Sequence, residues 1–164
     1  MTPPELTGKD LRSAFSRFPT GVVAVCAYGS AGPVGLVVST FVPVSLDPPL
    51  LAICLQRTSR TWPVLRTRPR LGVSVLGEHQ SETARALAAR DGDRFAGVQH
   101  SRVEGGGLRV VDSSAYFDCS LDQEVAAGDH DLALLRIHRA EVSDSAQPLV
   151  FHRSQFARLT APVI

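Results

Sequence analysis

The chain has 164 residues and a formal net charge of +1, with 44% hydrophobic and 20% charged residues. This balance is typical of one globular domain with a buried core, and the basic residues form no dense run of the kind that binds nucleic acid. No run approaches the roughly 18 apolar residues that span a bilayer, and residues 1–10 lack the features of a signal peptide. We therefore expect no nucleic-acid partner, no membrane association and a cytoplasmic location.

The N-terminal part is predicted to contain a loose tail and one short helix. The tail covers residues 1–8, and Thr7 and Asp10 have the spacing of a capping box, with aspartate in place of the usual Glu or Gln. Apolar residues then recur at helical spacing, at Leu11, Ala14, Phe15 and Phe18. An amphipathic helix is expected to run to about Arg17, where a Pro-Thr-Gly sequence ends it.

Most of the remaining chain has the pattern of β-strands. Strands are expected at residues 22–28, 34–38, 50–55, 71–76, 116–125, 132–142 and 148–152, with an extended piece at 154–159. Two further short helices are expected, one capped by Ser59 and running through Leu65, the other capped by Ser81 and reaching about Arg90. Residues 99–113 contain three consecutive glycines and are predicted to form a flexible loop with short extended pieces.

This arrangement predicts a mainly β fold. The strands do not alternate with long helices, and no Gly-x-Gly-x-x-Gly follows a strand, so a doubly wound parallel sheet is not expected. A closed or sandwiched antiparallel β-fold is the better interpretation. Because the sequence shows no repeat and no domain boundary, residues 1–164 are expected to form a single domain.

The sequence gives little support for a nucleophilic serine or cysteine site or for a metal site. The cysteines at 26, 54 and 119 are far apart and lie in apolar runs, which indicates buried free thiols in a reducing compartment. No Gly-x-Ser-x-Gly sequence is present, and no two histidines share a spacing typical of a metal site. His130 lies between Asp129 and Asp131, where we favour a polar turn over a metal site.

The segment from Val34 to Gln56 is the stronger candidate for a ligand-binding site. Two apolar runs flank a polar, proline-containing connection that is longer and richer in hydrogen-bonding groups than a hairpin turn requires. Hydroxyls at strand ends and in loops can hold a phosphate or the edge of a heteroaromatic ring, and Arg57 and Arg60 could add charge-assisted bonds. From composition alone, ordinary strand-end and turn chemistry is the better explanation of these residues.

Several segments resemble the flavin reductase family of FMN-binding split barrels, the reductase components of two-component flavin monooxygenases. The resemblance covers roughly residues 10–159. It rests on the ordered segments 15–25 (FSRFPTGVVAV), 34–41 (VGLVVSTF), 44–50 (VSLDPPL), 93–95 (DRF), 127–130 (AGDH) and 148–151 (PLVF).

The resemblance implies that each chain folds as an antiparallel split β-barrel with Greek-key connections. It also implies a homodimer with the flavin near the subunit interface. It further implies hydride transfer from NADH or NADPH to FMN or FAD, with the reduced flavin diffusing to a partner monooxygenase. No metal is implied. His130 would be the catalytic residue facing the nicotinamide. The implied flavin-binding residues are Val38, Ser39, Thr40, Ser45, Leu46, Asp47, Arg57, Thr58, Ser59, Thr61, Ser74, Val75, Leu76 and Gln80.

Two departures from the family pattern leave the choice between FMN and FAD open. Ser74 stands where relatives often have an amide, and Val37 to Thr40 contains one hydroxyl fewer. Two alternatives also remain at this point. One is a flavin-binding carrier or sensor of the same fold without reductase activity. The other is a split-barrel oxidase acting on a pyridoxamine phosphate, which would need more basic phosphate ligands than Arg57 and Arg60.

Overall fold

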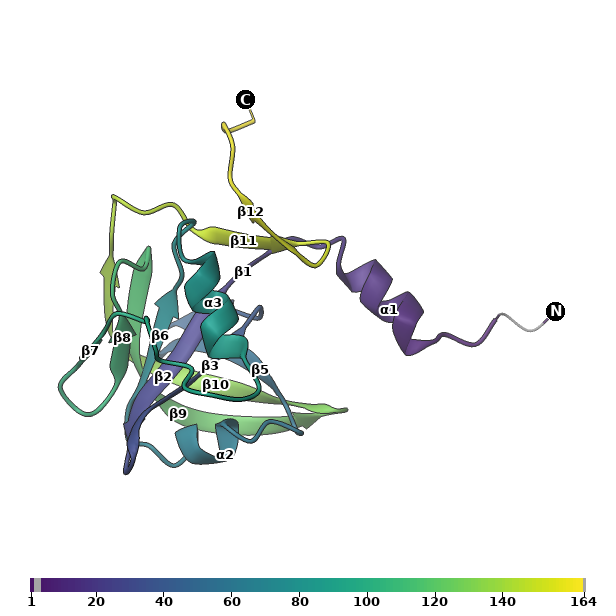
Figure 1. The fold of residues 1–164 in the computed structure, drawn as a ribbon. Coiled ribbons are helices and arrows are strands. Elements are labelled where there is room, and N and C mark those ends of the chain that lie inside the picture. Colours follow the sequence, from purple (N-terminus) through teal and green to yellow (C-terminus); the bar gives the residue numbers. More distant parts are fainter. Residues whose placement is uncertain (2–3, 164) are drawn as a thin grey trace.

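The computed structural model describes residue 1 and residues 4–163, and its elements follow one another from strand to strand with three short helices in the described part (Figure 1). The residues at positions 2 and 3 of the predicted tail lie outside the described residues. The elements are α1 (Gly8–Phe15), β1 (Thr20–Gly21), β2 (Val23–Gly29), β3 (Gly32–Val38), β4 (Val42–Leu46), β5 (Pro49–Gln56), α2 (Trp62–Leu65), β6 (Leu71–Val75), α3 (Ser81–Ala88), β7 (His100–Arg102), β8 (Leu108–Val110), β9 (Ala115–Ala127), β10 (His130–Val142), β11 (Leu149–His152) and β12 (Gln155–Arg158).

A seven-stranded sheet in the order β3-β2-β6-β9-β10-β5-β4 forms the body of the molecule. The longest strands, β9 and β10, have 13 residues each and pair along their whole length through a tight hairpin at Gly128, whose φ is +69°. Smaller sheets join β1, β11 and β12 at one end and β7 with β8 at one side. Every pairing of named strands is antiparallel, which confirms the predicted mainly β, antiparallel class.

The core lies on both faces of this sheet. Alternate residues of β2 point to opposite faces, so Val23 and Val25 join one apolar cluster while Ala24 and Cys26 join the other. The short helix α2 adds Trp62 and Leu65 to the first cluster, and α3 adds Ala84 and Leu87 to the second. Figure 1 shows α3 lying across the strands on its side of the sheet.

The positions of the helices agree with the sequence signals, but two of the predicted caps do not. Thr7 and Asp10 form the predicted capping box of α1. Ser59 accepts from the amide of Trp62 at 3.1 Å, but Thr61 occupies the N-cap position of α2. The prediction that Ser81 caps α3 is wrong, because Ser81 is already helical and Gln80 occupies the N-cap position without a side-chain cap bond. The helix also ends at Ala88 rather than near Arg90.

The connection after β3 contains a strand that was not predicted. β4 pairs with β5 through an irregular register between Pro43 and Ser45, so the polar crossing is itself an edge strand. The predicted loop at 99–113 likewise contains the short pair β7 and β8. In the described residues, the structure has no helix long and apolar enough to cross a membrane.

Candidate functional site

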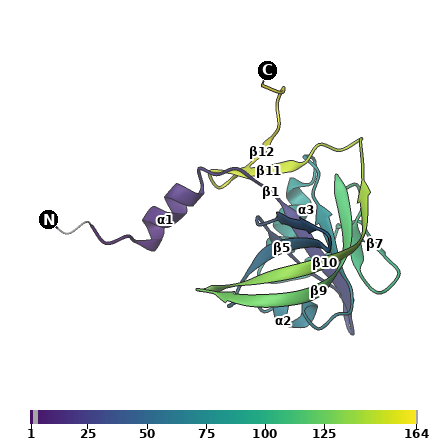
Figure 2. The ribbon, with the colours of Figure 1, turned by 180° about the vertical axis from the view of Figure 1, so that it is seen from behind.

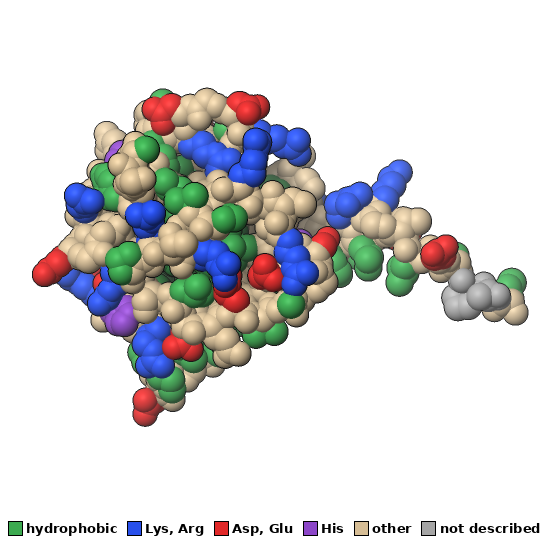
Figure 3. Space-filling model, turned by 90° about the horizontal axis from the view of Figure 1, so that it is seen from below, with side chains coloured by type: hydrophobic (Ala, Val, Ile, Leu, Met, Phe, Trp, Pro, Cys, Tyr) green, Lys and Arg blue, Asp and Glu red, His purple; other side chains and the backbone are tan. Residues whose placement is uncertain are grey.

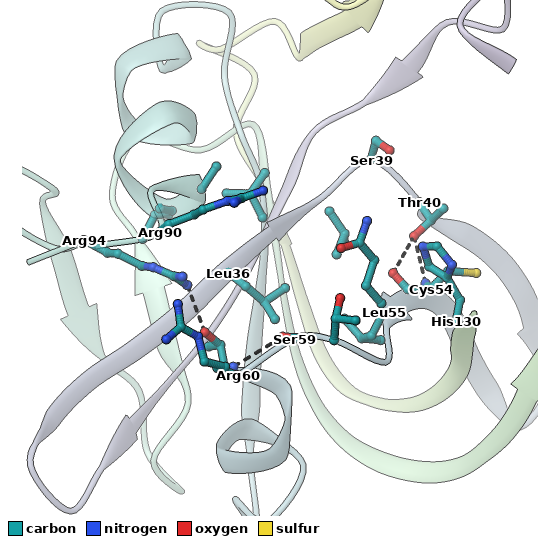
Figure 4. Close-up of a pocket in the computed structure, with 17 residues that line it drawn as sticks. Leu36, Ser39, Thr40, Cys54, Leu55, Ser59, Arg60, Arg90, Arg94 and His130 are labelled. Carbon is teal, nitrogen blue, oxygen red and sulfur yellow. Dashed lines mark hydrogen bonds between the residues drawn. The ribbon is translucent and has the colours of Figure 1, made fainter. Parts of the chain in front are cut away.

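A cavity of about 630 Å³ opens where several loops and strand ends converge (Figure 4). The ends of β3 and β5, the loop that follows β5, the C-terminal end of α3 and the start of β10 all contribute to it. Its volume lies in the range of small-molecule sites in proteins. The lining residues are Leu36, Val37, Val38, Ser39, Thr40, Cys54, Leu55, Gln56, Thr58, Ser59, Arg60, Thr61, Leu87, Ala88, Arg90, Arg94 and His130.

One glycine allows the wall of this cavity to form. A Cβ at Gly35 would lie 2.6 Å from Cys26 Sγ and 2.8 Å from Phe95 Cζ, both closer than packed atoms come. With no side chain at this position, the buried ring of Phe95 packs directly against β3. The Asp93 carboxylate accepts from the amide of Phe95 at 3.0 Å and fixes the turn. Arg94, between these two residues, is thereby placed at the edge of the cavity.

Three arginines give the cavity a positive character. Arg60, Arg90 and Arg94 line it, and no Asp or Glu is among the described lining residues. Arg94 Nη1 donates to the carbonyl of Gly35 at 3.1 Å and to Thr61 Oγ1 at 2.9 Å. It therefore joins β3 to the loop after β5. This charge distribution suits an anionic ligand, because guanidinium groups make strong charge-assisted bonds to phosphates.

The hydroxyl groups of the cavity differ in how many hydrogen bonds they already make within the protein. Thr40 Oγ1 accepts from the amide of Cys54 at 2.8 Å and lies 3.4 Å from the Cys54 carbonyl, so it fastens the end of β3 to β5. Ser59 accepts from two amides of its own turn and keeps its O–H available as a donor. Ser39 and Thr58 are exposed at the rim, where a ligand can reach them.

His130 is the first residue of β10 and reaches the cavity from the hairpin tip. In Figure 4 its ring lies beside Thr40 and Cys54. Nδ1 is 2.7 Å from the carboxylate of Asp129, and this hydrogen bond lowers the pKa of Asp129 below its ordinary value. A carboxylate at Nδ1 favours the tautomer with its proton there, which leaves Nε2 as an acceptor in the neutral ring.

The structure brings together seven of the predicted site residues. They come from β3 and the residues after it, the loop after β5, and β10: Val38, Ser39, Thr40, Thr58, Ser59, Thr61 and His130. Their roles toward a ligand remain predictions.

Four predicted residues lie outside this cavity on the surface. Ser45, Leu46 and Asp47 are at the far end of β4, where the Leu46 side chain is 96% exposed. Arg57 pairs with Asp131 at 3.1 Å and lines a separate, smaller cavity. In a single chain these residues do not share a pocket with His130.

Four other predicted residues lie in the interior and do not line this cavity. Ser74 is fully buried, and its hydroxyl accepts from the amide of Val110 at 3.1 Å. Gln80 accepts from the amide of Gly77 and donates to the carbonyl of Val111, at 2.8 and 2.7 Å. Leu76 is fully buried in the second apolar cluster, whereas Val75 packs against the first. The contacts of these four residues with a flavin stay predictions, and the site proposed below does not include them.

Sequence reasoning missed several lining residues, most notably Arg90 and Arg94. Arg94 stands in the Asp-Arg-Phe segment that carries part of the family resemblance, which was a usable signal. Arg90 follows the C-terminus of a helix and gave no signal, since exposed arginines are common there. Cys54 also lines the cavity, half buried at the centre of an apolar strand.

The other two cysteines, Cys26 and Cys119, do not line the cavity. Burial raises the pKa of the Cys26 and Cys119 thiols to about 12, so both are protonated at neutral pH. Within residues 1 and 4–163, no group of three or more His, Cys, Asp or Glu side chains is arranged to hold a metal ion.

Several known proteins resemble this chain over nearly its whole length. The family described as "Flavin reductase like domain" matches residues 15–160. The actinorhodin polyketide dimerase of Streptomyces coelicolor is 35% identical over 91% of this chain and 85% of its own. The reductase subunit HsaB of a flavin-dependent monooxygenase from Rhodococcus jostii is 33% identical over 88% of this chain and 74% of its own. An NADH:FAD oxidoreductase of Streptomyces globisporus, solved with NAD and FAD fragments, superposes with a TM-score of 0.88 at 30% identity, covering 96% of this chain and 98% of its own.

Proposed function

The chain belongs to the flavin reductase family, and from this membership we propose that the cavity between β3, β5 and α3 binds its flavin. The protein is an NAD(P)H-dependent flavin reductase that reduces FMN or FAD and supplies the reduced flavin to a monooxygenase component. The observation that carries the proposed site is the set of three arginines in a cavity whose described lining has no carboxylate.

The residues present fit a flavin phosphate at one end of the cavity. Arg60 and Arg90 are exposed at its rim, and Arg94 is half buried beside Thr61. The O–H groups of Thr58 and Ser59 are directed from the neighbouring loop and can donate to the same anion. We assign these five residues, with Thr61 as the partner of Arg94, to the phosphate end.

The apolar wall fits the ring system. Val38, half buried at the end of β3, offers an apolar surface on which a planar heteroaromatic ring can stack. Leu36 and Leu55 also line the cavity, but nearly all of their surface is buried in the core. Ser39, with the backbone N–H groups near it, provides polar contacts for the edge of the ring, where negative charge increases on reduction. When bound, NAD(P)H and the flavin supply the hydride chemistry, so the protein needs no acid–base pair of its own.

His130 orients the electron donor in this proposal. Its Nδ1 hydrogen bond to Asp129 fixes the rotation of the ring, and Nε2 is then free to accept from a carboxamide N–H of the nicotinamide. In this role His130 positions the nicotinamide and does not itself contact the flavin. Loss of this bond should therefore affect the donor and leave flavin binding unchanged.

Four further features complete the proposal. We propose that the sheet curls into a split barrel with Greek-key connections. In support, Thr40 links the end of edge strand β3 to β5 near the opposite edge. We further propose that residues 1–164 form one flavin reductase-like domain that works as a homodimer, since α1 and β4 expose large apolar side chains. A cytoplasmic location accords with three free cysteines, which persist in reducing compartments.

A grid of activity measurements tests the function. Purified protein is incubated with NADH or NADPH and with FMN, FAD or riboflavin, and the loss of nicotinamide absorbance is followed. Flavin-dependent oxidation is expected in at least one combination. If the protein binds flavin and yet no combination gives turnover, the carrier alternative replaces the reductase.

A further inference from the structure

The first residues of the chain form an arm that contacts little of their own subunit. We define the arm as residues 8–18, made of α1 and the three residues after it. No residue of α1 is buried, and Figures 1 and 2 both show the helix projecting from the body. An isolated helix of eight residues is marginal in water, so a fully exposed one needs a partner surface to persist.

One side of the arm is suited to such a partner. Leu11, Phe15 and Phe18 follow the i, i+4, i+7 spacing of a single helical face and are 38%, 71% and 76% exposed. In Figure 3 the apolar side chains of the projecting helix gather on one side and its basic side chains on the other. The arm is thus amphipathic, with its apolar face in solvent.

The base of the arm is fixed to the body. The amide of Arg153 donates to the carbonyl of Ser16 at 2.9 Å, and His152 Nε2 lies 3.2 Å from the carbonyl of Arg17. These contacts come from the last residue of β11 and from the turn that follows it. The arm is therefore held outward by its own subunit, which presents its apolar face and does not fold it back.

A second exposed apolar surface lies on β4. Val42, Val44 and Leu46 are 52%, 47% and 96% exposed, and we call these three residues the β4 strip. β4 is an edge strand of the large sheet, but it is a poor one for adding another strand. Pro43 has no amide to donate, and the pairing with β5 is irregular between Pro43 and Ser45. A partner is therefore expected to pack its side chains against the strip rather than to add a strand to the sheet.

We propose that the arm of each subunit covers the β4 strip of a second copy of the chain. The two surfaces match in length. The arm from Leu11 through the end of α1 at Phe15 to Phe18 in the following turn covers seven residue steps, about 10 Å at a helical rise, and the four steps of strand from Val42 to Leu46 span about 13 Å.

Reciprocal exchange accounts for both surfaces at once. Every copy carries one arm and one strip, so a two-fold dimer covers all four surfaces and leaves none open. A monooxygenase bound to the arm would leave the strip uncovered. This arm exchange rests on the homodimer proposed above and adds which residues form it.

Charge variants at one residue of each surface test the exchange. The mass of the full-length protein is measured by light scattering across a dilution series for wild type, Phe15→Lys and Leu46→Glu, with Val142→Lys as a control on an exposed apolar residue of β10 (81%). Wild type and the control are expected to be dimers. Each of the other variants is expected to raise the dimer dissociation constant by at least about 30-fold, the effect of losing a central interface side chain.

Mixing the two variants gives the decisive measurement. A mixed dimer of Phe15→Lys and Leu46→Glu chains has one wild-type arm on a wild-type strip and one lysine facing a glutamate, so dimers should return on mixing. Phe15→Lys chains that dimerise as wild type does, or a mixture that stays monomeric, would overturn the exchange. A monomeric wild type would overturn both the exchange and the homodimer. The activity grid is run in parallel, and it decides the reductase function independently of subunit mass.

Discussion

Replacement of Arg94 by methionine is expected to weaken flavin binding by about 10- to 40-fold, without unfolding the protein. The side chain joins the Gly35 carbonyl to Thr61 through two hydrogen bonds of 3.1 and 2.9 Å, and it adds one positive charge to the cavity. A hydrogen bond from a charged group contributes about 1.5–3 kcal/mol, and each 1.4 kcal/mol is tenfold in affinity. The lower half of that range applies because Arg94 is only half buried.

Three variants separate the charge from the geometry. Arg94→Lys keeps the charge but lacks the planar fork, so its dissociation constant for flavin should fall between those of wild type and Arg94→Met. Arg139→Met is the control, because Arg139 pairs with Glu141 on the surface and does not line the cavity. Each protein is titrated into FMN and into FAD while flavin fluorescence is recorded, and its thermal unfolding is followed by circular dichroism.

One outcome of these titrations would contradict the assignment of Arg94. If Arg94→Met binds both flavins within twofold of wild type and unfolds at the same temperature, the arginines do not form the phosphate end of the site. The assignment of this cavity to the flavin would then fall, although the family membership would be unaffected.

Three further variants or reagents probe the neighbouring residues. His130→Ala should raise the KM for the nicotinamide about tenfold, the effect of one lost hydrogen bond, while the flavin dissociation constant stays constant; a change in flavin binding instead would contradict its assigned role. A thiol reagent at pH 8 should label Cys54 and spare Cys26 and Cys119, whose pKa values of about 12 leave roughly one thiolate in ten thousand. Added FMN should slow that labelling, and equal rates with and without FMN would place the flavin elsewhere. Ser74→Ala should lower the free energy of unfolding in urea by about 1–3 kcal/mol, because a buried amide loses its acceptor, and should leave flavin affinity unchanged.

The sequence predicted the strands well because their signal is local. Alternation of apolar and polar residues indicates a strand wherever it pairs, and β9 and β10 were located in this way. β4 escaped because Pro43 and the prolines after Leu46 are typical of a turn, whereas here they limit an edge strand.

The site was predicted less completely, for two physical reasons. The sequence does not distinguish a polar residue that binds a ligand from one that hydrogen-bonds to the backbone. Ser74 was predicted to contact the flavin, and in the structure its hydroxyl accepts from the amide of Val110. The second reason is distance along the chain. Arg94 reaches Thr61 from 33 positions away, and only the packing of Phe95 on Gly35 brings the two together.

The hydrogen bond that Thr40 Oγ1 accepts from the amide of Cys54 in β5 affects the free energy of folding of the whole protein. It connects two parts of the large sheet that no ladder of backbone hydrogen bonds joins directly, and the cavity lies beside it. A ligand held by both β3 and β5 adds a second connection between them, so the free energy of its binding becomes free energy of folding. Flavin should therefore slow amide hydrogen exchange in β3 and β5 together, and release of the reduced flavin should return both strands to their faster exchange.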